Sequence, residues 1–131
     1  MLFRSHAGTR AALHLSQQAE QLGAAAVMIT PSRENVPSEE RIFEYFQRIA
    51  SGISIPIVAQ DHPASTQVHM SNELLLRMVA EIPQIACIKQ EAVPTPPKTR
   101  ALIKGMADGR DRKSTRLNSS HSSVSRMPSS A

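Results

Sequence analysis

The chain has 131 residues with 40% hydrophobic and 20% charged side chains, a balance typical of a soluble globular domain or part of one. The single cysteine, Cys87, excludes an intrachain disulfide, and no apolar run approaches the roughly 20 residues of a bilayer-spanning helix, so we predict a cytoplasmic protein without a membrane partner. The net charge of +4 raises the alternative of a nucleic-acid-binding module, which the location of the charge argues against below.

The chain opens with a short foreign-looking segment and then a predicted helix. Residues 1–5 resemble the translation of a synthetic sequencing adapter, and we leave them out of the fold prediction. Glycine adopts the left-handed conformation that follows many helix ends, so Gly23 predicts where the helix stops. The apolar residues at helical spacing, expected to face inward, are Ala11, Ala12, Leu15, Ala19 and Leu22.

Three short apolar runs follow at intervals of about thirty residues, spanning 24–29, 55–59 and 85–88. Each run is continuously apolar rather than alternating. Such a run is typical of a strand that is buried on both faces in a parallel sheet. We therefore predict three parallel strands.

The segments between these runs show the periodicity of amphipathic helices. Ser38 and Ser71 each stand where an N-cap is expected, and Thr95 with Pro96 forms a typical N-cap and first-turn pair. The predicted inward residues are Ile42, Phe43, Phe46, Ile49 and Ala50, then Leu74, Leu75, Met78, Val79 and Ile82, then Leu102, Ile103 and Met106.

The alternation of helices and strands predicts an α/β fold with right-handed crossovers, either a (β/α)8 barrel or a doubly wound sheet. No glycine-rich phosphate-binding turn follows a strand, which weakens the dinucleotide-binding option. Three strand–helix units leave open sheet edges, so we interpret residues 6–110 as part of a larger domain.

Residues 111–131 differ in character from the preceding chain. They are rich in serine and arginine, lack apolar periodicity and are predicted to be a disordered tail. Residues 111–121 and 125–131 also resemble a translated sequencing adapter. Between residues 6 and 110, ten basic residues balance ten acidic ones, so the positive excess lies outside this part and we predict no nucleic-acid partner.

The carboxyl ends of parallel strands are where reactive groups gather in α/β folds, and here they carry polar side chains. Lys89 directly follows the third apolar run. Burial disfavours an ammonium, and the neutral amine is the form that attacks a carbonyl. The alternative is a lysine that has left the strand and is solvated.

Asp61 and His62 end the second run and are candidates for general acid and base. The alternative is a turn with a capping aspartate and a solvated histidine. Two further histidines, His14 and His69, are predicted to be surface residues, and no ligand spacing indicates a metal site. Lys98, Arg100 and Lys104 are interpreted as a solvated helix face.

Three segments together resemble the dihydrodipicolinate synthase / N-acetylneuraminate lyase family. They are residues 22–31, 56–63 (Pro-Ile-Val-Ala-Gln-Asp-His-Pro) and 82–90, which ends in Ile-Lys-Gln. In order and spacing they are similar to strands four to six of that family's (β/α)8 barrel. The resemblance covers nearly all of residues 6–110 and about the middle third of a family member.

The resemblance implies a class I lyase or aldolase without a cofactor or metal. Lys89 falls on the family lysine that forms a Schiff base with pyruvate or a related 2-oxo acid, and Thr30 is a candidate for substrate binding. The family's usual tyrosine and arginine are replaced by Gln60 and Ser65. An amide cannot cycle a proton at neutral pH, so Asp61 or His62 would take over this work.

These replacements favour a variant lyase, aldolase or dehydratase over dihydrodipicolinate synthesis. The alternative is a ligand-binding or regulatory barrel that has lost catalysis. The resemblance also implies a homo-oligomer for the full-length form, and we expect the 131-residue chain by itself to be inactive.

Overall fold

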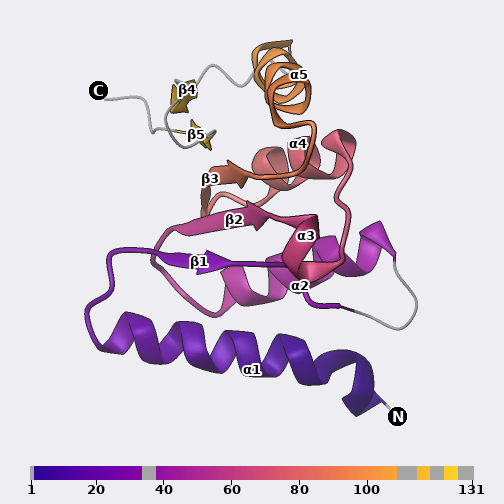
Figure 1. Cartoon of the computed structure of the whole chain (residues 1–131). Coiled ribbons are helices and arrows are strands. Elements are labelled where there is room, and N and C mark those ends of the chain that lie inside the picture. The colour runs from indigo at the N-terminus through magenta and orange to yellow at the C-terminus, as the bar shows by residue number, and fades with distance from the viewer. Residues whose placement is uncertain (1, 34–37, 109–114, 119–122, 127–131) are drawn as a thin grey trace.

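The computed structural model describes residues 2–33, 38–108, 115–118 and 123–126 (Figure 1). The elements in chain order are α1 (Leu2–Gln21), β1 (Val27–Ile29), α2 (Glu39–Ser51), β2 (Ile57–Asp61), α3 (Pro63–Thr66), α4 (Asn72–Glu81), β3 (Ile85–Gln90), α5 (Thr95–Asp108), β4 (Thr115–Asn118) and β5 (Ser123–Arg126). The predicted alternation of helices and strands is confirmed, with α3 as an unforeseen short helix after β2. Among the described helices, none is long and apolar enough to cross a bilayer.

The sheet has the strand order β1-β2-β3-β5-β4, and its first three strands are parallel as predicted. Their register aligns Ile29 with Ala59 and Gln60 with Lys89. In Figure 1 the helices follow the order of the strands, from α1 at the bottom of the view to α5 at the top. Parallel neighbours in chain order, each joined through a helix, are the repeating unit of a (β/α)8 barrel.

The two faces of the parallel strands differ sharply in burial. Alternation along a strand sends successive side chains to opposite faces. The face toward the helices is closed and holds Ile57, Ala59 and Asp61 on β2 and Ile88 and Gln90 on β3, all buried. An irregularity of the register beside Ile57 places the buried Ile85 opposite Ile57, on the same face. The other face is open, with Met28 55% exposed and Val58, Cys87 and Lys89 partly exposed.

Helices α2 and α4 bury the residues that their periodicity predicted. Every predicted inward residue of both segments is buried, from Ile42 to Ala50 and from Leu74 to Ile82. Ser71 caps α4 by accepting a hydrogen bond from Leu74 N at 3.1 Å. Ser38 is the N-cap of α2 but makes no side-chain cap bond. On α5, Leu102 and Met106 are buried and Ile103 is partly buried.

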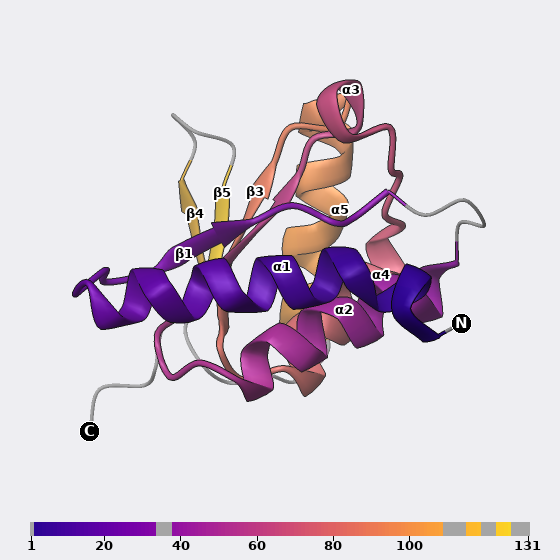
Figure 2. The ribbon, with the colours of Figure 1, turned by 90° about the horizontal axis from the view of Figure 1, so that it is seen from below.

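Helix α1 ends as predicted, but only part of its predicted apolar face is directed inward. Gly23 has φ of 89° and follows the last turn, and Ala24 N donates to Ala19 O at 3.0 Å. The predicted face is correct only in part, because Ala12 packs against the core while Leu15 is 64% and Leu22 88% exposed and Ser16 is buried. The Ser16 hydroxyl donates to a backbone carbonyl one turn earlier, which gives this buried hydroxyl its hydrogen-bond partner. Seen from below, α1 and α2 lie side by side (Figure 2).

The tail also differs from the prediction of disorder. Its residues 115–118 and 123–126 form an antiparallel pair, and β5 pairs with β3 through Cys87, Ile88 and Lys89. The tail can pair here because the outer edge of β3 has backbone N–H and C=O groups that are free to form hydrogen bonds with another strand. The other residues of the tail lie outside the described part of the chain.

Candidate active site

Four polar side chains meet at the carboxyl ends of β2 and β3, with Glu91 at their centre. Lys89 Nζ lies 3.0 Å from Glu91 Oε1. The other carboxylate oxygen, Oε2, accepts a hydrogen bond from Gln60 Nε2 at 2.7 Å and lies 3.8 Å from His62 Nδ1. The carboxylate therefore joins an amine, an amide and an imidazole in one cluster.

Strand geometry explains why these side chains meet. Lys89 and Glu91 are two positions apart, as are Gln60 and His62, so each pair is directed to one side of the sheet. Gln60 is directly opposite Lys89 in the parallel register, and Glu91 N donates to Asp61 O at 2.8 Å. Both pairs are therefore on the open face, and the exposed fractions of the Lys89 and Glu91 side chains are 30% and 31%.

The contacts of Glu91 stabilise its ionised form. The hydrogen bond from Gln60 is the largest cause of the lowered pKa of Glu91, and the hydrogen bond from Lys89 is the second. Partial burial acts in the opposite direction and is outweighed. Glu91 is therefore a carboxylate at neutral pH, placed to face a positive charge on Lys89 Nζ.

His62 is held by the short helix that follows it. Ser65 Oγ lies 2.9 Å from His62 Nδ1, and the backbone N–H groups of Ser65 and Thr66 donate to the His62 carbonyl. Pro63 occupies the first turn of α3, where a missing N–H costs nothing. Ser65 thus helps to hold the imidazole beside Glu91.

Thr30 lies directly after β1, and its backbone carbonyl accepts a hydrogen bond from the Tyr45 hydroxyl of α2 at 3.0 Å. Because Ile29 pairs with Ala59, Thr30 follows at the level of Gln60. Burial raises the pKa of Tyr45 to about 12. The neutral phenol therefore anchors the end of β1 at neutral pH.

Asp61 is separated from the cluster because it lies on the opposite face of β2. Its side chain is wholly buried, and Oδ2 lies 2.7 Å from Lys98 Nζ of α5. The interpretation of Lys98 as part of a solvated face is wrong, since its side chain is only 21% exposed and also donates to Met70 O. The pattern of charges on α5 could not reveal a buried partner on another element.

Glu91 was missed as a site residue by the sequence interpretation. Its two-residue spacing from Lys89 was the available signal, because a strand places such residues on one side. His14 and His69 are exposed, as predicted. Among the described residues, no group of three metal-binding side chains comes together.

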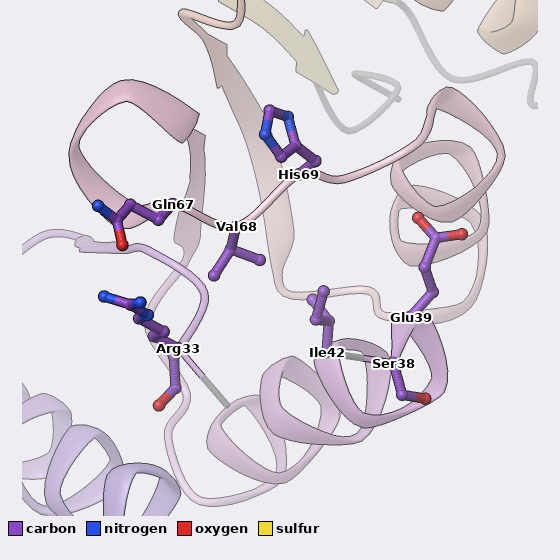
Figure 3. A pocket seen from close by; sticks show the side chains of 8 residues that line it. Arg33, Ser38, Glu39, Ile42, Gln67, Val68 and His69 are labelled. Carbon is purple, nitrogen blue, oxygen red and sulfur yellow. The ribbon is translucent and has the colours of Figure 1, made fainter. Parts of the chain in front are cut away.

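A separate pocket of about 480 Å³ lies between the end of β1, the start of α2 and the segment before α4 (Figure 3). Figure 3 shows Arg33 and Gln67 on one side and Glu39 on the other. None of the side chains around Glu91 lines it. Its lining residues are Ser32, Arg33, Ser38, Glu39, Ile42, Gln67, Val68 and His69.

A family model described as the dihydrodipicolinate synthetase family matches residues 5–109. The chain belongs to the dihydrodipicolinate synthetase family. The match extends over all three parallel strands and includes every residue of the cluster around Glu91. The resemblance seen in the three sequence segments is thereby confirmed.

Relatives of known name include a dehydratase and several synthases. The chain is 41% identical over 104 residues to an L-2-keto-3-deoxyarabonate dehydratase of Azospirillum brasilense, covering 76% of this chain and 33% of that protein. It is 40% identical over 79 residues to a 4-hydroxy-tetrahydrodipicolinate synthase of Neisseria meningitidis serogroup B, covering 60% of this chain and 27% of the relative. The chain thus spans about a third of the length of these relatives.

Solved structures of the family share the fold. A dihydrodipicolinate synthase from Acinetobacter baumannii complexed with pyruvate matches with a TM-score of 0.69 and 32% identity, over 76% of this chain and 33% of that one. The enzyme from Thermotoga maritima matches with a TM-score of 0.70 and 26% identity, over 78% and 34%. The predicted fold class, part of a (β/α)8 barrel, is confirmed.

Proposed function

We propose that Lys89 forms a Schiff base with the ketone of a 2-oxo acid, and that the whole protein is a lyase of the dehydratase type. The observation that carries this proposal is the contact of 3.0 Å between Lys89 Nζ and Glu91, within a cluster that also holds Gln60 and His62. The iminium formed by the amine is positively charged, so Schiff-base chemistry needs an anionic partner for this charge and a nearby proton carrier.

The first step uses Lys89 and Glu91. The Lys89 ammonium first passes a proton to His62, and the lone pair of Nζ then attacks the C2 carbonyl carbon. The carbonyl oxygen leaves as water with one N–H proton and the proton that His62 returns, and a positively charged iminium remains. Because Glu91 stays ionised at neutral pH, its carboxylate stabilises that charge at the place where it develops. Gln60 keeps the carboxylate oriented through its 2.7 Å hydrogen bond.

The second step is an elimination that needs a proton carrier. The iminium withdraws electrons, so a proton leaves C3 and the hydroxyl on C4 departs as water after it is protonated. Imidazole both accepts and donates protons near neutral pH, and His62 is the imidazole in the cluster. Hydrolysis then releases the dehydrated 2-oxo acid and returns the amine, so the net change is the loss of one water.

Two observations favour dehydration of a 2-keto-3-deoxy sugar acid over condensation with an aldehyde. Gln60 stands at the family's tyrosine position, and Ser65 binds His62 where the family has arginine. The relative that is 41% identical is an L-2-keto-3-deoxyarabonate dehydratase by name. We place Thr30 at the carboxylate of the substrate. The homo-oligomer and the cytoplasmic location stay predictions.

Borohydride trapping tests the Schiff base. The test uses a grafted barrel, in which residues 5–109 of this chain replace the matching third of the Azospirillum brasilense dehydratase. The rest of the dehydratase then closes the barrel. Incubation with pyruvate and borohydride should add the reduced pyruvyl group at Lys89, as peptide mass spectrometry would show. The Lys89→Arg variant should not be labelled, and the matched control Lys104→Arg, exposed on α5, should be labelled fully.

The same grafted barrel distinguishes a catalytic protein from one that only binds its ligand. Release of the dehydrated product from a 2-keto-3-deoxy sugar acid would support the dehydratase. Binding of the acid without any labelling of Lys89 would overturn the Schiff base and support a ligand-binding barrel instead. We expect the 131-residue chain by itself to show no turnover, because its site face is open to water.

A further inference from the structure

Behind the candidate site, on the helix side of the sheet, lies a buried ion pair. The Asp61 side chain has no exposed surface, and Lys98 Nζ lies 2.7 Å from Oδ2 and 2.5 Å from the Met70 carbonyl oxygen. Asp61 Oδ1 has no hydrogen-bond partner among the described residues. Lys98 is therefore the counterion on which this buried carboxylate depends.

The position of Lys98 is unfavourable for the helix that carries it. Lys98 is the fourth residue of α5, in the first turn, where the helix dipole disfavours a positive charge. Its side chain also loses most of its hydration, since only 21% stays exposed. Neither helix stability nor solubility favours a lysine at this position, so its contacts with Asp61 and Met70 account for its presence there.

Asp61 is connected to each of the three residues around Lys89. It stands between Gln60 and His62 in the chain, and its backbone carbonyl accepts the Glu91 N–H at 2.8 Å. Side chains of neighbouring strand residues are directed to opposite faces. Fixing the Asp61 carboxylate on one face therefore fixes the directions of Gln60 and His62 on the other.

We propose that Lys98 is a positioning residue, which acts through Asp61 to hold Gln60, His62 and Glu91 in place for the reaction at Lys89. This inference rests on the proposed function, because it assumes that a Schiff base forms at Lys89. The end point of borohydride trapping reports whether the amine and a ketone can combine, whereas the rate of turnover depends on having the surrounding groups in register. Loss of Lys98 therefore slows turnover and leaves the final extent of trapping unchanged.

The test compares variants of the grafted barrel by their rate of turnover divided by the number of molecules in which Lys89 can be labelled. Borohydride with pyruvate counts the molecules whose Lys89 is intact, and turnover of a 2-keto-3-deoxy sugar acid is divided by that count. For Lys98→Met we expect full labelling of Lys89 and a fall in kcat on the order of tenfold to a hundredfold, with little change in KM. Lys98→Arg should restore turnover in part, because a guanidinium can reach both acceptors.

A matched control and a second variant make the result decisive. Lys104→Met removes an exposed charge from the same helix and should leave turnover per labelled lysine unchanged. If Lys98→Met is insoluble, the Asp61→Asn, Lys98→Met double variant, which leaves no buried charge, replaces it. Unchanged turnover per labelled lysine in the soluble variant would overturn the positioning role. Absence of labelling in the parent barrel would instead overturn the proposed function.

Discussion

At the level of single residues, the strand ends explain the character of the site. The chain spaces Lys89 and Glu91 two positions apart, and Gln60 and His62 likewise, so the pleat of each strand brings the pairs to one face. Asp61, one position away from both Gln60 and His62, is directed to the other face and joins Lys98. A shift of one position along β2 thus distinguishes Gln60 and His62, which belong to the site, from Asp61, which contacts Lys98 on the opposite face of the sheet.

The hydroxyl of Tyr45 gives a prediction at the same scale. Tyr45 is the one tyrosine in the sequence, so tyrosinate absorbance reports it alone. Burial raises its pKa to about 12, so the absorbance of the folded chain should titrate about two pH units above the ordinary value of 10.0. Because the folded-state value is the higher one, the corresponding stability is present below pH 10 and is lost as pH rises toward 12.

Tyr45→Phe provides the comparison for this prediction. The variant loses the hydrogen bond to Thr30 O, which should lower the free energy of unfolding at neutral pH by about 1 kcal/mol. Urea unfolding at several pH values should show this difference shrinking above pH 10. A tyrosinate midpoint near 10.0 in the folded chain would contradict the burial of this hydroxyl.

At the level of elements, the helices α2 and α4 differ in how they begin. Ser71 accepts a hydrogen bond from Leu74 N and also contacts Glu39 through its N–H and hydroxyl, so the start of α4 is joined to that of α2. Ser38 has the extended conformation of an N-cap but makes no side-chain cap bond. The sequence pattern treated the two serines alike, because capping depends on a rotamer that the pattern does not contain.

Alanine substitution of the two serines tests this difference. Ser71→Ala should lower the free energy of unfolding by about 1 kcal/mol, because it leaves a helix N–H without its acceptor. Ser38→Ala is the matched control and should cost clearly less. Both values come from urea unfolding followed by circular dichroism. Equal losses in the two variants would argue against the cap at Ser71.

At the level of the whole molecule, the strand β1 leaves one edge of the described sheet open. The strand β1 forms one edge of the order β1-β2-β3-β5-β4, and Met28 on it is 55% exposed. An exposed apolar residue on an edge strand favours pairing with another chain. The open face and the open edge are therefore the surfaces through which the 131-residue chain should associate.

A charge on the edge strand should reduce this association. We expect Met28→Lys to shift the 131-residue chain toward the monomer in sedimentation velocity at matched concentration, because a lysine must be desolvated to enter a new sheet. Leu15→Lys is the control, since Leu15 is also exposed but lies on α1. If both lysine variants reduce association equally, the contact is a general apolar one and does not involve the edge of β1.

Local patterns in the chain were sufficient to predict the order of the elements, the parallel strands and the buried faces of α2 and α4. Apolar periodicity and continuous apolar runs are local properties that the chain carries with it. It also placed Lys89, Gln60 and His62 at strand ends, and the family resemblance attached a chemistry to the lysine.

Which polar groups meet depends instead on the packing of segments that are distant in the chain. The partner of Lys98 is 37 residues away on another element, and that of Gln60 is 31 residues away. The inward face of α1 was set by its contact with α2, so Ser16 is buried and Leu15 is exposed. Such pairings depend on strand register and on helix rotation, which the packing of distant segments fixes and no local pattern contains.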